Sequence, residues 1–190
     1  MNVWFTSDQH FGHKAIIKLG QRPFKDVKEM DETMVTNWNK VIKSEDTVYV
    51  LGDFIHKSNH SIEYYAKQLN GHKHLIIGNH DHDLAEYKKY FETGQQIIYL
   101  NINEQEIVLF HYPILSWKRK GRGAWHLYGH VHNAIMEPME TQKAYNVGVD
   151  VNNFTPISFE QLKPIMDSRN AQISDKADHW HSPKSTQGKT

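Results

Sequence analysis

Histidine and aspartate recur in this sequence at short spacings that suit metal binding and acid–base chemistry. Residues 78–83 read GNHDHD directly after an apolar run, and similar polar stretches stand at 7–13, 51–56, 109–113 and 127–132. Histidine is the commonest metal ligand in proteins, and the chain contains fourteen. Taken singly, each stretch also suits a polar turn, because Asp and Asn favour loops. Which chemistry applies therefore depends on whether the chain brings the stretches together.

The first half of the chain predicts strands that alternate with helices. Its apolar runs are short enough for buried strands, and residues 26–42 repeat apolar side chains at three- and four-residue steps, which is typical of an amphipathic helix. Met30, Met34 and Trp38 on this helix are expected in the core. Such alternation implies parallel strands joined by crossovers. The expected strands cover 2–7, 47–51 and 74–77, and the expected helices cover 26–42, 61–69 and 84–91.

The second half is expected to be richer in antiparallel strands. Residues 95–111 read as two strands joined by a tight turn at Asn103-Glu104, and 125–130 and 144–151 read as two more. A last helix is expected to begin at Ser158, where Gln161 completes a capping box, with Pro164 near its end or at a kink.

Composition favours one soluble, cytoplasmic domain over residues 1–166. The chain has no cysteine, no signal-peptide pattern and no long apolar run that could span a membrane. Its 22 basic and 22 acidic residues balance, which disfavours a large nucleic-acid footprint without excluding a local basic patch. Residues 167–190 are polar and are expected to be a disordered tail in which His179 and His181 are inert.

The five polar stretches are expected to converge, because ligands of open α/β sheets bind outside the carboxyl ends of the strands. Seven nitrogen and oxygen donors exceed the needs of one tetrahedral ion and suit two ions about 3.5–4 Å apart that share a carboxylate. The mixed donor set favours Mn, with Fe, Zn or Ni as alternatives, over Mg or Ca. The expected ligands are Asp8, His10, Asp53, Asn79, His111, His130 and His132.

The charge of such a site points to phosphoester hydrolysis. Two divalent ions, the two aspartates and a bridging hydroxide leave a net positive charge that can hold a phosphate, and metal-bound water is acidified toward a pKa of about 7. His80 follows the expected ligand Asn79, so it can stand beside the metals and protonate the leaving oxygen. Asp81 is expected to orient a neighbour through hydrogen bonds.

Taken in order, these motifs resemble those of the calcineurin-like metallophosphoesterase superfamily. The motifs are Asp8-x-His10, Gly52-Asp53, Gly78-Asn79-His80-Asp81, His111 and Gly129-His130-x-His132, and the details FGH, HYPILSW and NVGVDV are similar to small bacterial and phage members without a cap domain. The resemblance implies an α/β (α+β) fold, a four-layer αββα sandwich of two mixed β-sheets with the metal site at the C-terminal ends of the strands. It also implies one ion held by Asp8, His10, Asp53 and His132, and another held by Asp53, Asn79, His111 and His130.

The resemblance also bears on the substrate. His56 matches the position that supports the catalytic histidine in the phosphodiesterase and DNA-repair nuclease branches, whereas the Asp-Arg pair of the protein phosphatases is missing after Asp53. The leading hypothesis is therefore a phosphodiesterase of nucleotides or cyclic nucleotides, with attack by a metal-bridging hydroxide and His80 as general acid. A phosphomonoesterase or a nuclease of nucleic-acid ends is the alternative. A silent interaction scaffold is disfavoured because scaffold members have typically lost the histidine at position 80.

One basic segment is a candidate for substrate contact. Residues 116–126 lie between two expected ligands, so both ends of the segment are expected to return to the metal edge. Arg122 is the preferred phosphate contact because it can bond in a bidentate manner, with Lys118 and Arg119 beside it. Trp117 or Trp125 is expected to stack on a base. The alternative is a solvated loop.

The remaining histidines of the first half are expected to be solvated surface residues. They are His13, His60, His72, His74 and His82.

Overall fold

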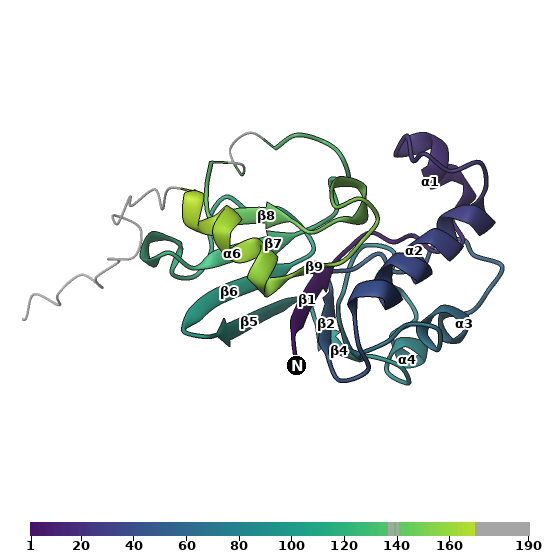
Figure 1. Cartoon of the computed structure of the whole chain (residues 1–190), viewed down its shortest axis with the longest axis horizontal. Coiled ribbons are helices and arrows are strands. Elements are labelled where there is room, and N and C mark those ends of the chain that lie inside the picture. The colour runs from purple at the N-terminus through teal and green to yellow at the C-terminus, as the bar shows by residue number, and fades with distance from the viewer. Residues whose placement is uncertain (137–138, 140, 170–190) are drawn as a thin grey trace, which may run out of the picture.

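The first β-sheet forms from the apolar runs that precede three of the polar stretches. In the computed structural model, which describes residues 1–136, 139 and 141–169, the order of this sheet is β4-β3-β2-β1-β9 (Figure 1). The first four strands are parallel and β9 is antiparallel to β1. Their bounds are Val3–Thr6 for β1, Thr47–Val50 for β2, His72–Ile76 for β3, Glu92–Gln95 for β4 and Ile157–Ser158 for β9.

Helices cover the outer face of this sheet, on the right of Figure 1. The carboxylate of Asp26 caps α2 by accepting a hydrogen bond from the Glu29 backbone N–H, and α2 buries Met30, Met34 and Trp38 as predicted. Helix α3 is shorter than expected, and α1 and β4 were missed because both are too short to show a clear period. The helices are α1 (Lys14–Leu19), α2 (Val27–Val41), α3 (Ile62–Ala66) and α4 (Leu84–Tyr87).

The second sheet begins with the predicted hairpin and continues differently from the prediction. Strands β5 (Ile97–Ile102) and β6 (Gln105–Phe110) are antiparallel, and both turn residues, Asn103 and Glu104, have positive φ as a two-residue hairpin turn requires. However, β7 (Trp125–Tyr128) and β8 (Ala144–Asn146) run parallel to β6, so the expected antiparallel arrangement is wrong for them. The connections before β7 and β8 are long enough to return to the end of the sheet at which β6 starts.

Two of the three hydrophobic clusters formed by the described residues hold these layers together. One lies between the first sheet and helices α2 and α3, and the other lies between the two sheets, where Phe5 and Leu51 meet Leu109 and Leu127. Helix α6 (Phe159–Ser168) adds Leu162 to the core between the sheets. These two mixed sheets with helices confirm the predicted fold class.

The last described helix confirms the predicted capping box. The Ser158 hydroxyl accepts a hydrogen bond from the backbone N–H of Gln161, whose side-chain oxygen accepts from the backbone N–H of Ser158. Pro164 lies inside α6, which continues to Ser168 and so passes the expected domain boundary at 166. Residues 170–190 of the expected tail lie outside the described residues. Within the described part of the chain, no helix combines the length and the apolar character that crossing a bilayer requires.

Candidate metal centre

The two sheets meet at the carboxyl ends of their strands. The Asp8 backbone N–H donates to the Gly52 carbonyl over 3.0 Å, which aligns the end of β1 with the end of β2. The Val149 N–H donates to the Ser7 carbonyl over 3.0 Å, and Ser7 forms an isolated bridge with Gly148, beyond β8. Polar side chains from both sheets therefore face the same space.

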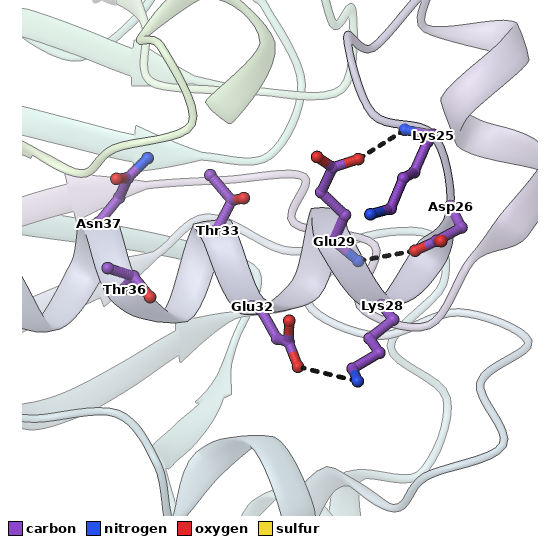
Figure 2. Close-up of a pocket in the computed structure, with 8 residues that line it drawn as sticks. All are labelled: Lys25, Asp26, Lys28, Glu29, Glu32, Thr33, Thr36 and Asn37. Atoms are coloured by element: carbon purple, nitrogen blue, oxygen red, sulfur yellow. Dashed lines mark hydrogen bonds and ion pairs between the residues drawn. The ribbon is translucent and has the colours of Figure 1, made fainter.

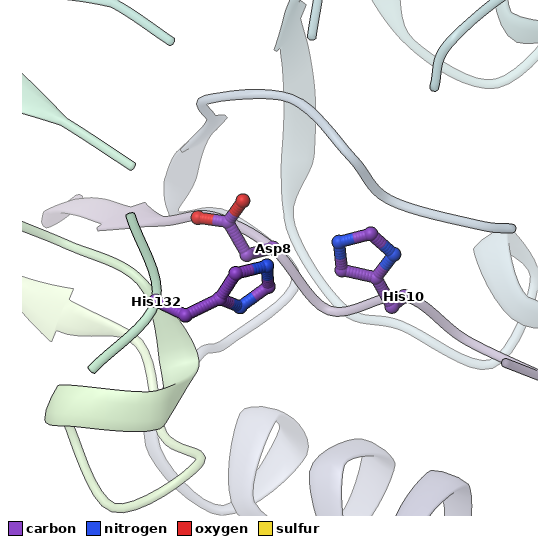
Figure 3. A group of neighbouring side chains, drawn as sticks. All are labelled: Asp8, His10 and His132. Atoms are coloured by element: carbon purple, nitrogen blue, oxygen red, sulfur yellow. The ribbon is translucent and has the colours of Figure 1, made fainter. Parts of the chain in front are cut away.

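Asp8, His10 and His132 form one group of expected ligands. One donor atom from each lies within 4.8 Å of the others. Figure 3 shows Asp8 and His10 on the segment that follows β1, with His132 approaching from the second half of the chain. The backbone N–H of His130 donates to both carboxylate oxygens of Asp8, at 3.1 and 2.9 Å, and so fixes that carboxylate.

The Asp53 carboxylate lies between this group and a second one. Its Oδ2 lies 3.5 Å from His10 Nε2 and 3.6 Å from His111 Nε2. Asn79 Oδ1 lies 3.0 Å from His111 Nε2 and 2.9 Å from His130 Nδ1, so these three donors converge on one point. The structure thus gathers all seven residues predicted as ligands.

The chemistry of the donors fits divalent metal ions. Both ring nitrogens of His10 are buried without a hydrogen-bond partner among the described residues, an unfavourable state for polar atoms. Burial and the nearby charge of His132 lower the pKa of His10 to about 2, so its imidazole is neutral and able to bind a metal. Burial also raises the pKa of Asp8 to about 6, which a bound cation would reverse.

The backbone at this edge is strained in a way that suits close packing of ligand loops. Asp8, His10, Asp53, His130 and His132 all have left-handed φ between 50° and 70°. Such conformations disfavour L-residues and concentrate at functional sites. Glycine is required at position 129, next to the ligand His130. A Cβ atom there would overlap with the Ser7 hydroxyl and the Asp8 carboxylate.

Asp81 organises two of these loops through hydrogen bonds, as predicted. Its carboxylate accepts from the backbone N–H groups of Asp53 (2.8 Å), Phe54 (3.2 Å) and Gly78 (2.9 Å), and from the Tyr87 hydroxyl (2.7 Å). The segments after β2 and β3 are joined by this one buried side chain. Asp53 and Asn79 are thereby set in place.

A row of imidazoles continues from the ligand groups. The His80 backbone N–H donates to Asp53 Oδ1 over 2.9 Å, and the His80 Nε2 lies 4.0 Å from Asp53 Oδ2. The His80 ring lies 3.9 Å from that of His56, centroid to centroid, and the His56 ring lies 4.6 Å from that of His13.

The expectation that His13 is a surface residue is wrong. It is buried, because the chain turns at Gly12 into α1 and packs the ring between His10 and His56. Burial lowers its pKa to about 4. His60, His72 and His82 are exposed as expected, whereas His74 is partly buried against Tyr49.

Two further residues at this centre, Arg22 and Asp150, were not among the predicted site residues. Asp150 Oδ2 lies 2.8 Å from His132 Nδ1, and the Arg22 guanidinium binds both oxygens of Asp150. Burial alone would raise the pKa of Asp150, but hydrogen bonds from His132 and Arg22 lower it. Asp150 belongs to the NVGVDV motif and was detectable there, whereas Arg22 carries no local signal.

Contrary to expectation, the basic segment (residues 116–126) does not return to the metal edge at both of its ends. Its 3-10 helix, Lys120–Arg122, leads into β7, which starts at the opposite end of the sheet, and the Gly123 carbonyl accepts from the Gln105 side chain at the start of β6. Arg119 forms an ion pair with Glu106 near the same end, and Lys118 lies over the Tyr99 ring. Because β7 is parallel to β6, Arg122 and Arg119 lie near the end of the sheet opposite the ligand groups, and the structure gives no support to the expected phosphate contacts by Arg122, Arg119 and Lys118.

The two tryptophans of this segment are not available to stack on a base. Trp117 is buried, and its indole N–H donates to the Ala124 carbonyl over 2.8 Å. Trp125 is buried in the core between the sheets. Both serve packing.

A surface hollow along α2 is unrelated to the ligand groups. Figure 2 shows contacts among its lining residues: the Glu29 carboxylate accepts from the Lys25 backbone N–H, and Lys28 forms an exposed ion pair with Glu32. The hollow therefore gives no functional assignment.

Comparison with known proteins decides the family. The model of the calcineurin-like phosphoesterase superfamily domain matches residues 1–155. The chain belongs to this superfamily. With its gathered Asp and His side chains, it is a metal-dependent phosphoesterase of the calcineurin-like superfamily.

Relatives of this superfamily member come from archaea, phages and bacteria. An uncharacterised protein of Methanocaldococcus jannaschii is 32% identical over 171 residues, which cover 87% of this chain and 91% of that protein. The Gene 66 protein of Mycobacterium phage L5 is 28% identical over 181 residues, which cover 78% of this chain and 86% of that protein. The crystal structure of AQ665, a protein of unknown function from Aquifex aeolicus, superposes with a TM-score of 0.72 at 29% identity, covering 86% of this chain and 98% of that one.

The role of Asp81 gives a stability prediction. Asp81→Asn places an amide NH₂ group among three backbone N–H donors, so we expect the free energy of unfolding of the metal-free protein to fall by about 1–3 kcal/mol. Tyr87→Phe removes one of the four hydrogen bonds and should lower it by only about 0.5–1.5 kcal/mol. Urea titrations followed by circular dichroism measure both. Equal losses in the two variants would contradict the organising role of the carboxylate.

Proposed function

We propose that this phosphoesterase hydrolyses phosphodiesters of nucleotides or cyclic nucleotides, with two divalent transition-metal ions and His80 as the general acid. The observation that carries the proposal is the position of His80. Its backbone N–H donates to Asp53, and a ring nitrogen lies within 4.8 Å of donor atoms of His10 and Asp53, so His80 stands at the ligand groups although it is not one of the seven expected ligands. A group in this position is available for proton transfer.

The general-acid role assigned to His80 needs only its own ring and the neighbouring His56. Hydrolysis breaks the bond between phosphorus and the leaving oxygen, and that oxygen must gain a proton as it departs. A protonated imidazole can donate this proton and recover one afterwards from the water that was consumed. His56 packs against the His80 ring at 3.9 Å between centroids and limits its rotation. We assign His56 the role of positioning the acid.

The seven donors would hold two ions, with Asp53 shared between them. When bound, the ions supply an acidified water as nucleophile and offset the negative charge that develops on the phosphate. The mixed carboxylate, amide and imidazole set suits Mn best, with Fe, Zn and Ni as alternatives. Asp8, His10 and His132 would complete one site, and Asn79, His111 and His130 the other.

The preference for diesters rests on His56. A histidine at this position is a feature of the phosphodiesterase and nuclease branches that the motifs resemble, and here it contacts the proposed acid. Monoester and nucleic-acid-end activities are the competing outcomes of the substrate test below. A cytoplasmic location remains a prediction from composition.

Metal content tests the dinuclear centre. Protein reconstituted with excess Mn²⁺ and then desalted should approach two ions per chain by elemental analysis. The metal content of Asp53→Asn should fall well below two ions per chain, because a shared carboxylate contributes to both sites. Asp46→Asn is the matched control, since Asp46 is also buried but binds Asn2 and Trp4 at the amino end of β1. A value of one that Asp53→Asn leaves unchanged would contradict the two-ion centre.

Substrate preference tests the reaction class. We expect the Mn-loaded enzyme to hydrolyse linear or cyclic nucleotide diesters with a kcat/KM at least about tenfold above that of the matching monoesters, a difference of about 1.4 kcal/mol in transition-state binding. Phosphate release and product chromatography across one nucleoside series measure this. Faster monoester turnover would replace the diester proposal with a monoesterase. Loss of terminal nucleotides from oligonucleotides alone would indicate a nuclease.

Leaving-group dependence tests His80. His80→Ala should lower kcat by about 10²–10⁴ for a nucleotide diester with an alcohol leaving group, while metal content stays at the wild-type level. The loss should shrink for a nitrophenyl diester, whose leaving group departs without a proton. His82→Ala is the control, because His82 lies two residues away and is exposed. An equal loss for both substrates would remove the acid role.

A further inference from the structure

A buried ion pair lies behind the ligand group of Asp8, His10 and His132, and the proposed mechanism does not use it. The Arg22 Nε donates to Asp150 Oδ1 over 2.8 Å, and its Nη2 donates to Asp150 Oδ2 over 3.0 Å. The side chains of both residues are almost fully buried. The two residues are 128 positions apart, so the pair ties the start of the chain to the segment after β8.

Asp150 sets the orientation of one expected ligand. Its Oδ2 lies 2.8 Å from His132 Nδ1, which leaves Nε2 as the nitrogen available to a metal. A carboxylate that accepts from the distal nitrogen of a ligating imidazole fixes the tautomer and the ring plane. The His132 backbone is held as well, because its carbonyl accepts from the Asn146 side chain over 2.8 Å.

Arg22 holds the backbone that carries the other two ligands. Its Nη2 donates to the Asp8 carbonyl over 2.7 Å, and its Nη1 donates to the Gln9 carbonyl over 2.8 Å. Asp8 and His10 on either side of Gln9 have left-handed φ of 60° and 51°. Only a planar group with several fixed donors can bond two consecutive carbonyls and a carboxylate together, and lysine lacks that geometry.

A simple packing role does not account for this arrangement. A buried ion pair is often no better for stability than apolar residues of similar volume, because both charges must leave water. Here every polar contact made by the Arg22 guanidinium other than that to Met30 goes to Asp150 or to the ligand-bearing backbone, within the described residues. The pair thus links the positions of three expected ligands that come from two different sheets.

We propose that Arg22 and Asp150 are positioning residues that preform the ion site of Asp8, His10 and His132 and set its affinity separately from that of the site of Asn79, His111 and His130. This inference rests on the proposed function only in requiring that divalent ions bind at this centre. It assigns the pair no contact with substrate.

Metal titration separates the two ion sites. Chelator-treated wild type, Asp150→Asn and Arg22→Lys are titrated with Mn²⁺, and free ion is followed by electron paramagnetic resonance. Wild type should bind two ions. Asp150→Asn should bind one of them about 10–100-fold more weakly, the usual effect of removing such a partner, and the other with unchanged affinity. Arg22→Lys should weaken the same ion.

The control and the contrary outcomes are distinct. Asp46→Asn removes a buried carboxylate at the amino end of β1, away from the ligand groups, and should leave both affinities unchanged. If Asp150→Asn binds both ions as tightly as wild type, or loses both equally, the positioning role is wrong while the metal centre stands. If wild type itself binds no Mn²⁺, the proposed function fails, and the inference with it.

A measurement on the wild-type chain covers the case in which the variants do not fold. Long-range ¹H–¹⁵N spectra of ¹⁵N-histidine protein loaded with Zn²⁺, a diamagnetic probe, should show His132 with a protonated Nδ1 and a metal-bound Nε2. The resonance is identified by its absence in His132→Gln. An unprotonated, metal-bound Nδ1 would overturn the proposal, because Asp150 could not then accept from it.

Discussion

The rest of the structure depends on one constraint: four ligand side chains are removed from water where the two sheets meet. Asp8, His10, Asp53 and His111 are at most 2% exposed. Buried carboxylates and unpaired imidazoles are unfavourable unless other groups replace their lost hydration. Backbone N–H groups supply part of the replacement, and a bound cation can supply the rest. The left-handed loops and the glycine at 129 serve to bring these groups close enough.

The ligand set could be predicted from sequence because its pattern is local. Each ligand stands within four residues of the end of a strand, and the carboxyl ends of parallel strands meet at one edge. The carboxylate, amide and imidazole groups of these residues then indicated a divalent-metal site, without any knowledge of distances. The same reasoning predicted α2 and the capping box at Ser158, since both depend on neighbours in sequence.

The remaining features depend on contacts that no local pattern encodes. Arg22 meets Asp150 only after both sheets have formed. The basic segment was misplaced because the direction of β7 follows from its pairing with β6, and a parallel strand must start at the edge opposite His111. His13 was misjudged because its burial depends on the course of α1, a helix too short to show a period. Tertiary pairing, more than residue type, determined these outcomes.

The left-handed backbone at the ligand positions links the abundance of this protein to its metal supply. Each such residue stores roughly 1–3 kcal/mol of strain, which the metal-free fold must carry unaided. An ion that binds only the folded chain raises its stability by about 2.7 kcal/mol when present at a hundred times its dissociation constant. Loss of the ion would therefore raise the unfolded fraction, which is the form that proteases remove. Metal limitation would then lower the amount of the enzyme as well as its activity.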